Sequence, residues 1–134
     1  MADLTGRCLC GRVKYSATGD PIRSGICHCR NCQRYTGSAF EPFLAFPTTS
    51  VVVTGELKSY EHDAASGRAV RRCFCPTCGS GVVNVVPMRG LTVILAGTLD
   101  DPSRFEPAFE IFCVTSMPWV GSGKTIKRFP GMPG

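Results

Sequence analysis

The cysteines are the residues whose types and spacing indicate chemistry. Eight of the nine lie in three short clusters, and the ninth, Cys113, stands alone. The clusters are Cys8/Cys10, Cys27/Cys29/Cys32 and Cys73/Cys75/Cys78. Structural zinc takes four ligands in a tetrahedron, commonly all thiolates, from closely spaced pairs in separate segments of the chain. The spacing of the clusters therefore predicts metal binding.

The C-x-x-C pair of Cys75 and Cys78 has the sequence features of a zinc knuckle. Pro76 fixes a turn dihedral, and Gly79 permits the positive φ that follows such a turn. The pair needs two more ligands, and an N-terminal strand supplies them if residues two apart point to one face. We predict a closed structural zinc site made of Cys8, Cys10, Cys75 and Cys78.

Cys27, Cys29 and Cys32 form a cluster of three thiols with no obvious fourth protein ligand. A short helical turn is expected at residues 29–34, as in many metal knuckles. Catalytic zinc sites characteristically keep three protein ligands and one open position for water or substrate. A soft metal held by thiolates accepts a substrate thiol and favours its deprotonated form. These cysteines are therefore predicted to form a catalytic zinc site that activates a small thiol such as glutathione.

A closed, purely structural second site is the alternative, with Cys73, Cys113, His28 or His62 as its fourth ligand. His28 lies between two predicted ligands and is expected to point away from the metal. His62 is expected on a solvated turn, and Cys113, within an apolar segment, is expected in the core. Cys73 shares a strand face with Cys75 and is a candidate neighbour of the first site.

Length and composition place these sites in one small domain spanning residues 1–134. The N-terminal sequence MADLTGRCLC lacks the apolar segment of a secretory signal, and no apolar run approaches the ~18 residues of a membrane helix. We therefore expect a cytoplasmic protein whose reduced cysteines bind metal. The net charge of +5 is scattered, so neither nucleic-acid nor membrane partners are expected. The oligomeric state stays open.

The elements that must position the cysteines are predicted to be short strands. Fifteen glycines and ten prolines disfavour long helices. Alternating apolar residues at Val13, Tyr15 and Ala17 predict a half-buried strand. Residues 40–46 are predicted to form an edge or bent strand, because Pro42 interrupts them.

Further apolar runs complete an all-β fold class. Residues 51–53 are a β-branched run, and residues 57–61 are predicted to be its hairpin partner. Residues 82–86 and 91–96 are predicted to be two buried strands, and residues 109–114 a last strand. These lengths, with turn signals between them, are typical of an all-β domain.

Several motifs occur in the order and spacing of a known family. They are GRCLCG at residues 6–11 followed by Val13-Lys14-Tyr15, CHCRNCQR at 27–34, TGSAF at 36–40, FCPTCGS at 74–80, AGTLDDP at 96–102 and Pro118-Trp119. On these motifs the sequence resembles the glutathione-dependent formaldehyde-activating enzyme family, which includes centromere protein V-like proteins. The resemblance covers a core of about residues 6–119 and leaves a C-terminal tail, residues 120–134. Residues 118–134 are predicted to be loop.

The resemblance implies a β-rich, Mss4-like fold whose sheets meet around a zinc site. It implies two zinc ions per chain, a structural one and a catalytic one. The implied structural ligands are Cys8, Cys10, Cys75 and Cys78, and the implied catalytic ligands are Cys27, Cys29 and Cys32. It also implies a carbon–sulfur lyase, S-(hydroxymethyl)glutathione synthase, which adds the glutathione thiol to formaldehyde or a related small aldehyde.

Two other functions stay open at this point. One is a non-catalytic zinc-binding scaffold that binds a partner, and the other is a thiol redox protein that uses Cys73 and Cys113. For the enzyme, Gln33 and Ser38 are candidates to hydrogen-bond substrate near the three-cysteine cluster. Trp119 is a candidate wall of the same pocket.

Overall fold

The computed structural model describes residues 3–120 and 126–133, which form two β-sheets and, within these ranges, one α-helix. The smaller sheet has the strand order β1-β2-β5 and is antiparallel throughout. Its strands are β1 (Leu4–Arg7), β2 (Lys14–Ala17) and β5 (Val51–Thr54). The domain is β-rich, as predicted from the spacing of apolar residues and turn signals.

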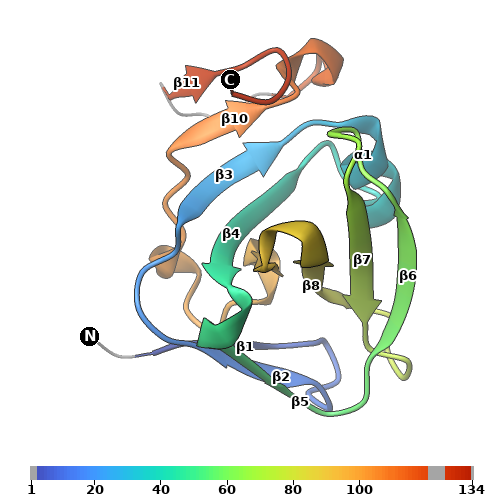
Figure 1. The fold of residues 1–134 in the computed structure, drawn as a ribbon, viewed down its shortest axis with the longest axis vertical. Coiled ribbons are helices and arrows are strands. Elements are labelled where there is room, and N and C mark those ends of the chain that lie inside the picture. The colour runs from blue at the N-terminus through green and yellow to red at the C-terminus, as the bar shows by residue number, and fades with distance from the viewer. Residues whose placement is uncertain (1–2, 121–125, 134) are drawn as a thin grey trace.

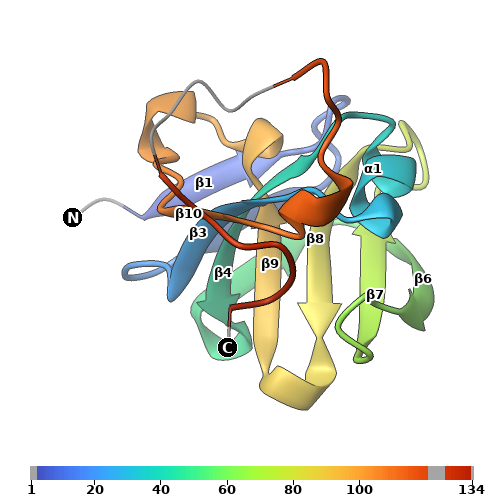
Figure 2. The same cartoon turned by 90° about the horizontal axis from the view of Figure 1, so that it is seen from above.

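The larger sheet has the order β11-β10-β3-β4-β9-β8-β7-β6. Its strands are β3 (Arg23–Cys27), β4 (Glu41–Pro47), β6 (Lys58–Asp63), β7 (Ala69–Phe74), β8 (Gly81–Val86), β9 (Leu91–Leu95), β10 (Phe109–Ile111) and β11 (Lys127–Arg128). β10 runs parallel to β3 and β11, and the other pairs are antiparallel. Figure 1 shows that this sheet is strongly curled, with the smaller sheet across one end, and Figure 2 shows the molecule from above.

The helical segments are short. α1 (Arg30–Thr36) follows β3 closely, and it ends at Gly37, whose φ of 67° is left-handed. Single 3₁₀ turns occur at Thr48–Ser50, Pro87–Arg89, Ala96–Thr98, Pro102–Arg104 and Cys113–Thr115. None of the described helices has the length and apolarity that crossing a bilayer requires.

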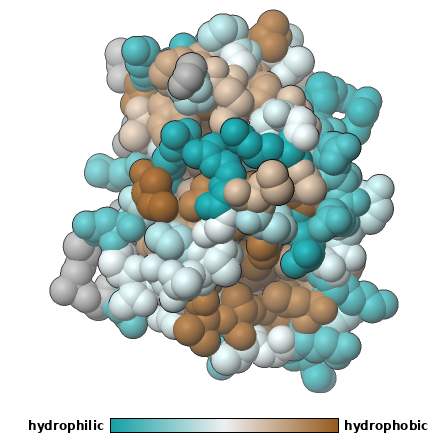
Figure 3. All heavy atoms as spheres, in the orientation of Figure 1, coloured by the Kyte–Doolittle hydropathy of each residue, from teal (hydrophilic) through white to brown (hydrophobic). Residues whose placement is uncertain are grey.

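The main core joins the two sheets. Tyr15 of the smaller sheet packs with Phe46 and Ile94 of the larger one. The Tyr15 hydroxyl lies 2.8 Å from Thr98 Oγ1, so its polar end is hydrogen-bonded inside the fold. Gly6 leaves the space that the Tyr15 ring occupies, because a Cβ there would collide with the ring. In Figure 3, hydrophilic side chains cross the middle of the visible face and a hydrophobic patch lies over the smaller sheet.

Several sequence predictions are confirmed. Val13, Tyr15 and Ala17 are all buried, as their alternation predicted. The runs at 82–86 and 91–96 are the antiparallel strands β8 and β9. The expected helical turn is α1.

The predicted strand at 40–46 is the central strand β4, so the prediction that it is an edge strand is wrong. β4 lies between β3 and β9. Pro42 faces Ile26 of β3, whereas pairing with β9 begins at Phe43. The proline therefore lies where β4 has only one neighbour, and its missing N–H costs no bond to β9.

Residues 57–61 are not the hairpin partner of β5, so that prediction is also wrong. β6 pairs with β7, and β5 pairs with β2. The turn at Gly55 instead carries the chain from one sheet to the other. Gly55 has a φ of 101°, and a Cβ there would collide with the Arg12 carbonyl oxygen. Only glycine fits this crossing.

The last predicted strand, at 109–114, is shorter than expected. β10 stops at Ile111 because Phe112 adopts a left-handed φ of 54°. The predicted loop at 118–134 contains β11, although residues 121–125 and 134 of that prediction lie outside the described residues. Phe129 packs edge-on against Phe109, with ring centroids 6.4 Å apart, and this contact brings the tail back to the sheet.

Candidate metal centres

The four predicted structural ligands meet at one point. Cys8 and Cys10 lie in the turn after β1, and Cys75 and Cys78 lie between β7 and β8, followed by Gly79 with a φ of 78°. The four sulfur atoms lie within 4.8 Å of one another. Cys10 Sγ lies 3.7 Å from Cys8 Sγ and 3.8 Å from Cys75 Sγ. A tetrahedral ion with zinc–sulfur bonds of about 2.3 Å separates its sulfurs by about 3.8 Å, so the cluster is compatible with zinc.

The N-terminal pair of this cluster lies on a turn and not on the predicted strand. β1 ends at Arg7, before either cysteine. The turn is closed by the Cys8 N–H, which donates to the Val13 carbonyl oxygen at 3.0 Å, and by Gly11 with a φ of 83°. The Val13 N–H also donates to Cys8 Sγ at 3.3 Å, as a thiolate ligand would require.

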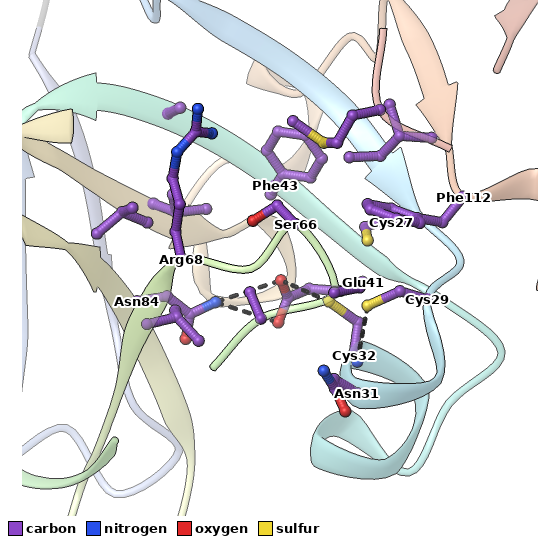
Figure 4. A pocket seen from close by; sticks show the side chains of 18 of the residues that line it. Cys27, Cys29, Asn31, Cys32, Glu41, Phe43, Ser66, Arg68, Asn84 and Phe112 are labelled. Atoms are coloured by element: carbon purple, nitrogen blue, oxygen red, sulfur yellow. Dashed lines mark hydrogen bonds between the residues drawn. The ribbon is translucent and has the colours of Figure 1, made fainter. Parts of the chain in front are cut away.

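Cys27, Cys29 and Cys32 converge where β3 leads into α1 (Figure 4). Cys27 ends β3, Cys29 caps α1 and Cys32 lies in its first turn. The three sulfurs lie within 4.8 Å of one another, and all three residues are buried. The Cys32 N–H donates to Cys29 Sγ at 3.3 Å. This donor set suits a soft metal ion that keeps one position for a further ligand.

Without a metal, the three thiols do not share negative charge equally. Hydrogen bonds from the Cys27 and Cys32 thiols lower the pKa of Cys29 to about 2. The contact with Cys29 raises the pKa of Cys27 to about 12. These hydrogen bonds therefore favour the thiolate form of Cys29.

Neither histidine joins the three sulfurs. His28 points away from them, as expected, and its Nε2 lies 2.7 Å from Glu110 Oε1 in a buried pair. His62 lies on β6 and not on the predicted solvated turn. Its Nε2 accepts a hydrogen bond from Arg72 Nε at 3.1 Å. Both alternatives for a histidine fourth ligand are thus outside this cluster.

The two remaining cysteines lie in different neighbourhoods. Cys73 packs in the main core with Cys8 and Cys75, where burial raises its pKa. Cys113 is half-buried, not fully buried in the core as predicted, and lies close to His28 and Glu110. Neither belongs to the group formed by Cys27, Cys29 and Cys32.

Three buried polar residues beside this cluster were not predicted from the sequence: Glu41, Arg72 and Asn84. The Cys32 thiol donates to Glu41 Oε2 at 3.5 Å, and Arg72 Nη1 donates to Glu41 Oε1 at 3.0 Å. Asn84 Nδ2 donates to both carboxylate oxygens, at 3.3 and 3.2 Å. Arg72 Nη2 also lies 3.7 Å from Cys32 Sγ, so its positive charge offsets the charge of a thiolate there.

Two polar residues within apolar segments of the sequence indicate this buried network. Asn84 interrupts the apolar strand GVVNVV, and Glu41 opens the apolar strand EPFLAFP. A lone polar residue in a buried strand needs a buried partner. Burial raises the pKa of Glu41, whereas Arg72 and Asn84 oppose that shift.

We expect Arg72→Met to lower the free energy of unfolding by about 3–5 kcal/mol, because it leaves Glu41 buried without its counter-ion. Arg71→Met is the matched control. Arg71 pairs with Glu61 at 3.5 Å on the surface, so its loss should cost less than about 1 kcal/mol. Urea unfolding of both variants measures the difference. Equal losses would contradict the structural role assigned to the buried pair.

A cavity of about 170 Å³ opens above the three-cysteine cluster. Cys27, Cys29 and Cys32 line one end of it, and Arg23, Arg68 and Arg89 are exposed among its other lining residues. Figure 4 shows the three cysteines at one side of this space and Arg68 at the other. We call these three arginines the arginine rim. A ligand that spans the cavity from the sulfurs therefore meets positive charge.

The other residues proposed to contact substrate lie elsewhere. Gln33, Ser38 and Trp119 line a depression that shares no lining residue with the cysteine cavity. Gln33 Nε2 donates to the carbonyl oxygens of Ala39 and Thr115, at 3.1 and 3.0 Å, so it ties loops together. Trp119 is 71% exposed and does not wall the cavity.

The fold and its two cysteine clusters define a small β-rich domain with two groups of thiols suited to metal ions, as predicted. A model of the family described as glutathione-dependent formaldehyde-activating enzyme matches residues 3–115. The chain belongs to this family. Membership supports a function of the kind for which the family is named. A search of curated proteins found no match.

Proposed function

We propose that the protein is a zinc-dependent carbon–sulfur lyase that resembles S-(hydroxymethyl)glutathione synthase and adds the glutathione thiol to formaldehyde. Its proposed catalytic zinc ligands are Cys27, Cys29 and Cys32. One observation carries the proposal: these three sulfurs converge at one end of an open cavity, and no fourth His, Cys, Asp or Glu ligand of the described chain completes the group. The cavity that these cysteines line would give a substrate room to supply the fourth ligand.

Zinc at this position would favour the thiolate form of the bound thiol and hold its sulfur in place. The reaction forms a bond between that sulfur and the carbonyl carbon and breaks the carbonyl π bond. The thiol proton leaves to water through the cavity mouth, and the new alkoxide oxygen takes a proton from water. The chain's own contribution is to fix both reactants next to each other in one cavity.

The arginine rim supports a thiol with anionic groups. Glutathione carries two carboxylates, and Arg23, Arg68 and Arg89 offer planar donors that suit carboxylates. Arg23 and Cys27 lie at opposite ends of β3, four residues apart on one strand face. Their Cα atoms are therefore about 13 Å apart along the strand. The long side chain of Arg23 can bring its guanidinium closer to the sulfurs, to a distance that a tripeptide spans.

We expect Arg68→Glu to raise the KM for glutathione by about 10–100-fold and to leave kcat nearly unchanged, because a charge-assisted hydrogen bond becomes a repulsion. Lys14→Glu makes the same change in charge on β2, outside the cavity. Steady-state kinetics at varied glutathione concentration measure both. The assignment of the rim is wrong if both variants raise the KM equally.

The proposed activity is tested by nuclear magnetic resonance exchange spectroscopy on glutathione and formaldehyde. Zinc-loaded protein should accelerate their interconversion with the adduct beyond the rate in buffer, and apo protein should not. Cys113→Ser is the control variant, because Cys113 lies outside both zinc-site clusters. Exchange at the buffer rate in the zinc-loaded protein would refute the activity.

The other cluster, which has four cysteines, is proposed to stabilise the fold. We assign a second zinc ion to Cys8, Cys10, Cys75 and Cys78, with a role in stability. Met132 and Pro133 line the cavity, which supports residues 1–134 acting as one unit. All nine cysteines are free, which supports function in a reducing cytoplasm. The scattered net charge of +5 remains the reason for proposing neither a nucleic-acid nor a membrane partner.

A further inference from the structure

The wall of the cysteine cavity is apolar between its two polar ends. Among its lining residues are Phe43, Val70, Val93, Phe109 and Ile111. Val70 and Ile111 are buried, and Phe43 is only 8% exposed. These side chains offer carbon surface and no hydrogen-bond partner to a ligand.

The aromatic part of the wall fits against β3 because residue 25 is a glycine and has no side chain. A Cβ at Gly25 would lie 3.1 Å from Cζ of both Phe43 and Phe109. The two rings meet edge to face, with centroids 6.1 Å apart, and Phe129 supports Phe109 from the tail. The rings are thus held in place, and the apolar wall is a defined surface.

The wall lies on the path between the sulfurs and the arginine rim. On β3, the residue between Cys27 and Arg23 on the same face is Gly25, where the two rings pack. Figure 4 shows Phe43 over the space between Arg68 and the cysteines. A group attached to a sulfur at the cysteine end therefore meets carbon surface before it meets charge.

Formaldehyde does not use this surface. Formaldehyde has two heavy atoms and no carbon body that could pack on the wall. Where glutathione extends from the cysteines to the arginine rim, its peptide groups find no hydrogen-bond partner on Phe43, Val70 or Val93, so they face away from this wall and leave it open. The wall fits the alkyl or aromatic body of an aldehyde larger than formaldehyde.

We propose that the physiological electrophile is an aldehyde with an apolar body, which packs on the wall formed by Phe43, Val70 and Val93. The inference rests on the proposed function, since the same site forms the adduct. The sulfur–carbon bond forms at the aldehyde carbon, the carbonyl π bond breaks, and the thiol proton is replaced by a proton on the new hydroxyl. The product is a longer hemithioacetal of glutathione.

Two stable thioethers test the wall directly by isothermal titration calorimetry on the zinc-loaded protein. S-methylglutathione and S-hexylglutathione share the glutathione tripeptide and differ only in the length of the alkyl group on its sulfur. Each buried CH₂ contributes up to about a fourfold gain in affinity. We expect S-hexylglutathione to bind at least about tenfold more tightly.

Val93→Thr and Val52→Thr form the matched pair of variants. Both keep the β-branched shape, but Val93 lines the cavity, whereas Val52 is 60% exposed on the smaller sheet. Val93→Thr should lower the affinity for S-hexylglutathione several-fold and leave the affinity for S-methylglutathione unchanged. Val52→Thr should change neither affinity.

Equal affinity of the two thioethers overturns the inference. If the protein still accelerates adduct formation from formaldehyde, the proposed function survives that result. If neither thioether binds and the formaldehyde reaction also runs at the buffer rate, both proposals fail. Equal effects of the two valine variants would place the alkyl group outside the cavity and also overturn the inference.

Discussion

Cys78→Ser is expected to leave the chain without a cooperative fold. Cys78 Sγ is one of four sulfurs that tie the turn after β1 to the turn between β7 and β8. Structural zinc contributes about 10–16 kcal/mol of binding free energy to folding, whereas a domain of this kind has a stability of only about 5–15 kcal/mol. Far-ultraviolet circular dichroism with thermal melting measures the loss.

The control for this variant is Cys113→Ser, which removes a half-buried thiol that belongs to neither proposed zinc site. It should melt within a few degrees of the wild type. A Cys78→Ser protein that keeps a cooperative melting transition near that of the control would show that the four-cysteine cluster does not hold the fold together.

Cys29→Ser is expected to keep the fold and to lose the second zinc ion together with the activity. Serine is a good helix cap, so it can still accept the Cys32 N–H at the start of α1. Its neutral hydroxyl cannot replace a thiolate as a ligand of a soft metal ion. Loss of a direct ligand should weaken metal binding by more than about 100-fold, since removal of an outer partner alone costs 10–100-fold.

Zinc content, melting temperature and exchange rate of the Cys29→Ser protein measure these effects. The expected protein holds one zinc ion, melts close to the wild type and exchanges glutathione and formaldehyde at the buffer rate. If Cys29→Ser unfolds the chain as fully as Cys78→Ser, the division into a structural and a catalytic site is wrong.

The positions of the cysteine clusters followed from local spacing. A C-x-x-C turn such as that of Cys75 and Cys78 brings two sulfurs together wherever it lies in the fold, because the geometry is set within a few residues. The helical turn after Cys29 followed for the same reason. Alternation at Val13, Tyr15 and Ala17 likewise predicts which face is buried without knowledge of the partner strand.

The features that the sequence did not reveal depend on contacts between distant segments. Glu41, Arg72 and Asn84 come from β4, β7 and β8, and only the curling of the larger sheet brings them together beside Cys32. β4 can be a central strand despite Pro42 because its pairing with β9 begins only at the next residue. Where a neighbouring strand ends decides whether a proline costs a hydrogen bond. No pattern within either segment contains that information.

The tail shows the same limit. Residues 127–128 pair with β10, and next to them Phe129 packs against Phe109, 20 residues earlier in the chain. The proline- and glycine-rich composition of the tail predicted a loop and gave no sign of this contact. Through this contact, Met132 and Pro133 reach the cavity. Lys127 Nζ lies 5.2 Å from the centre of the Phe129 ring, which further supports the short strand β11.

We propose that the chain holds one closed and one open zinc site. Zinc analysis by mass spectrometry, before and after exposure to a mild chelator, tests it most directly when circular dichroism is recorded on the same samples. We predict two zinc ions per chain at first and one after chelation, with the fold retained and the exchange activity lost. A scaffold would instead keep both ions. Retention of both ions, or loss of both together with the fold, would contradict the claim.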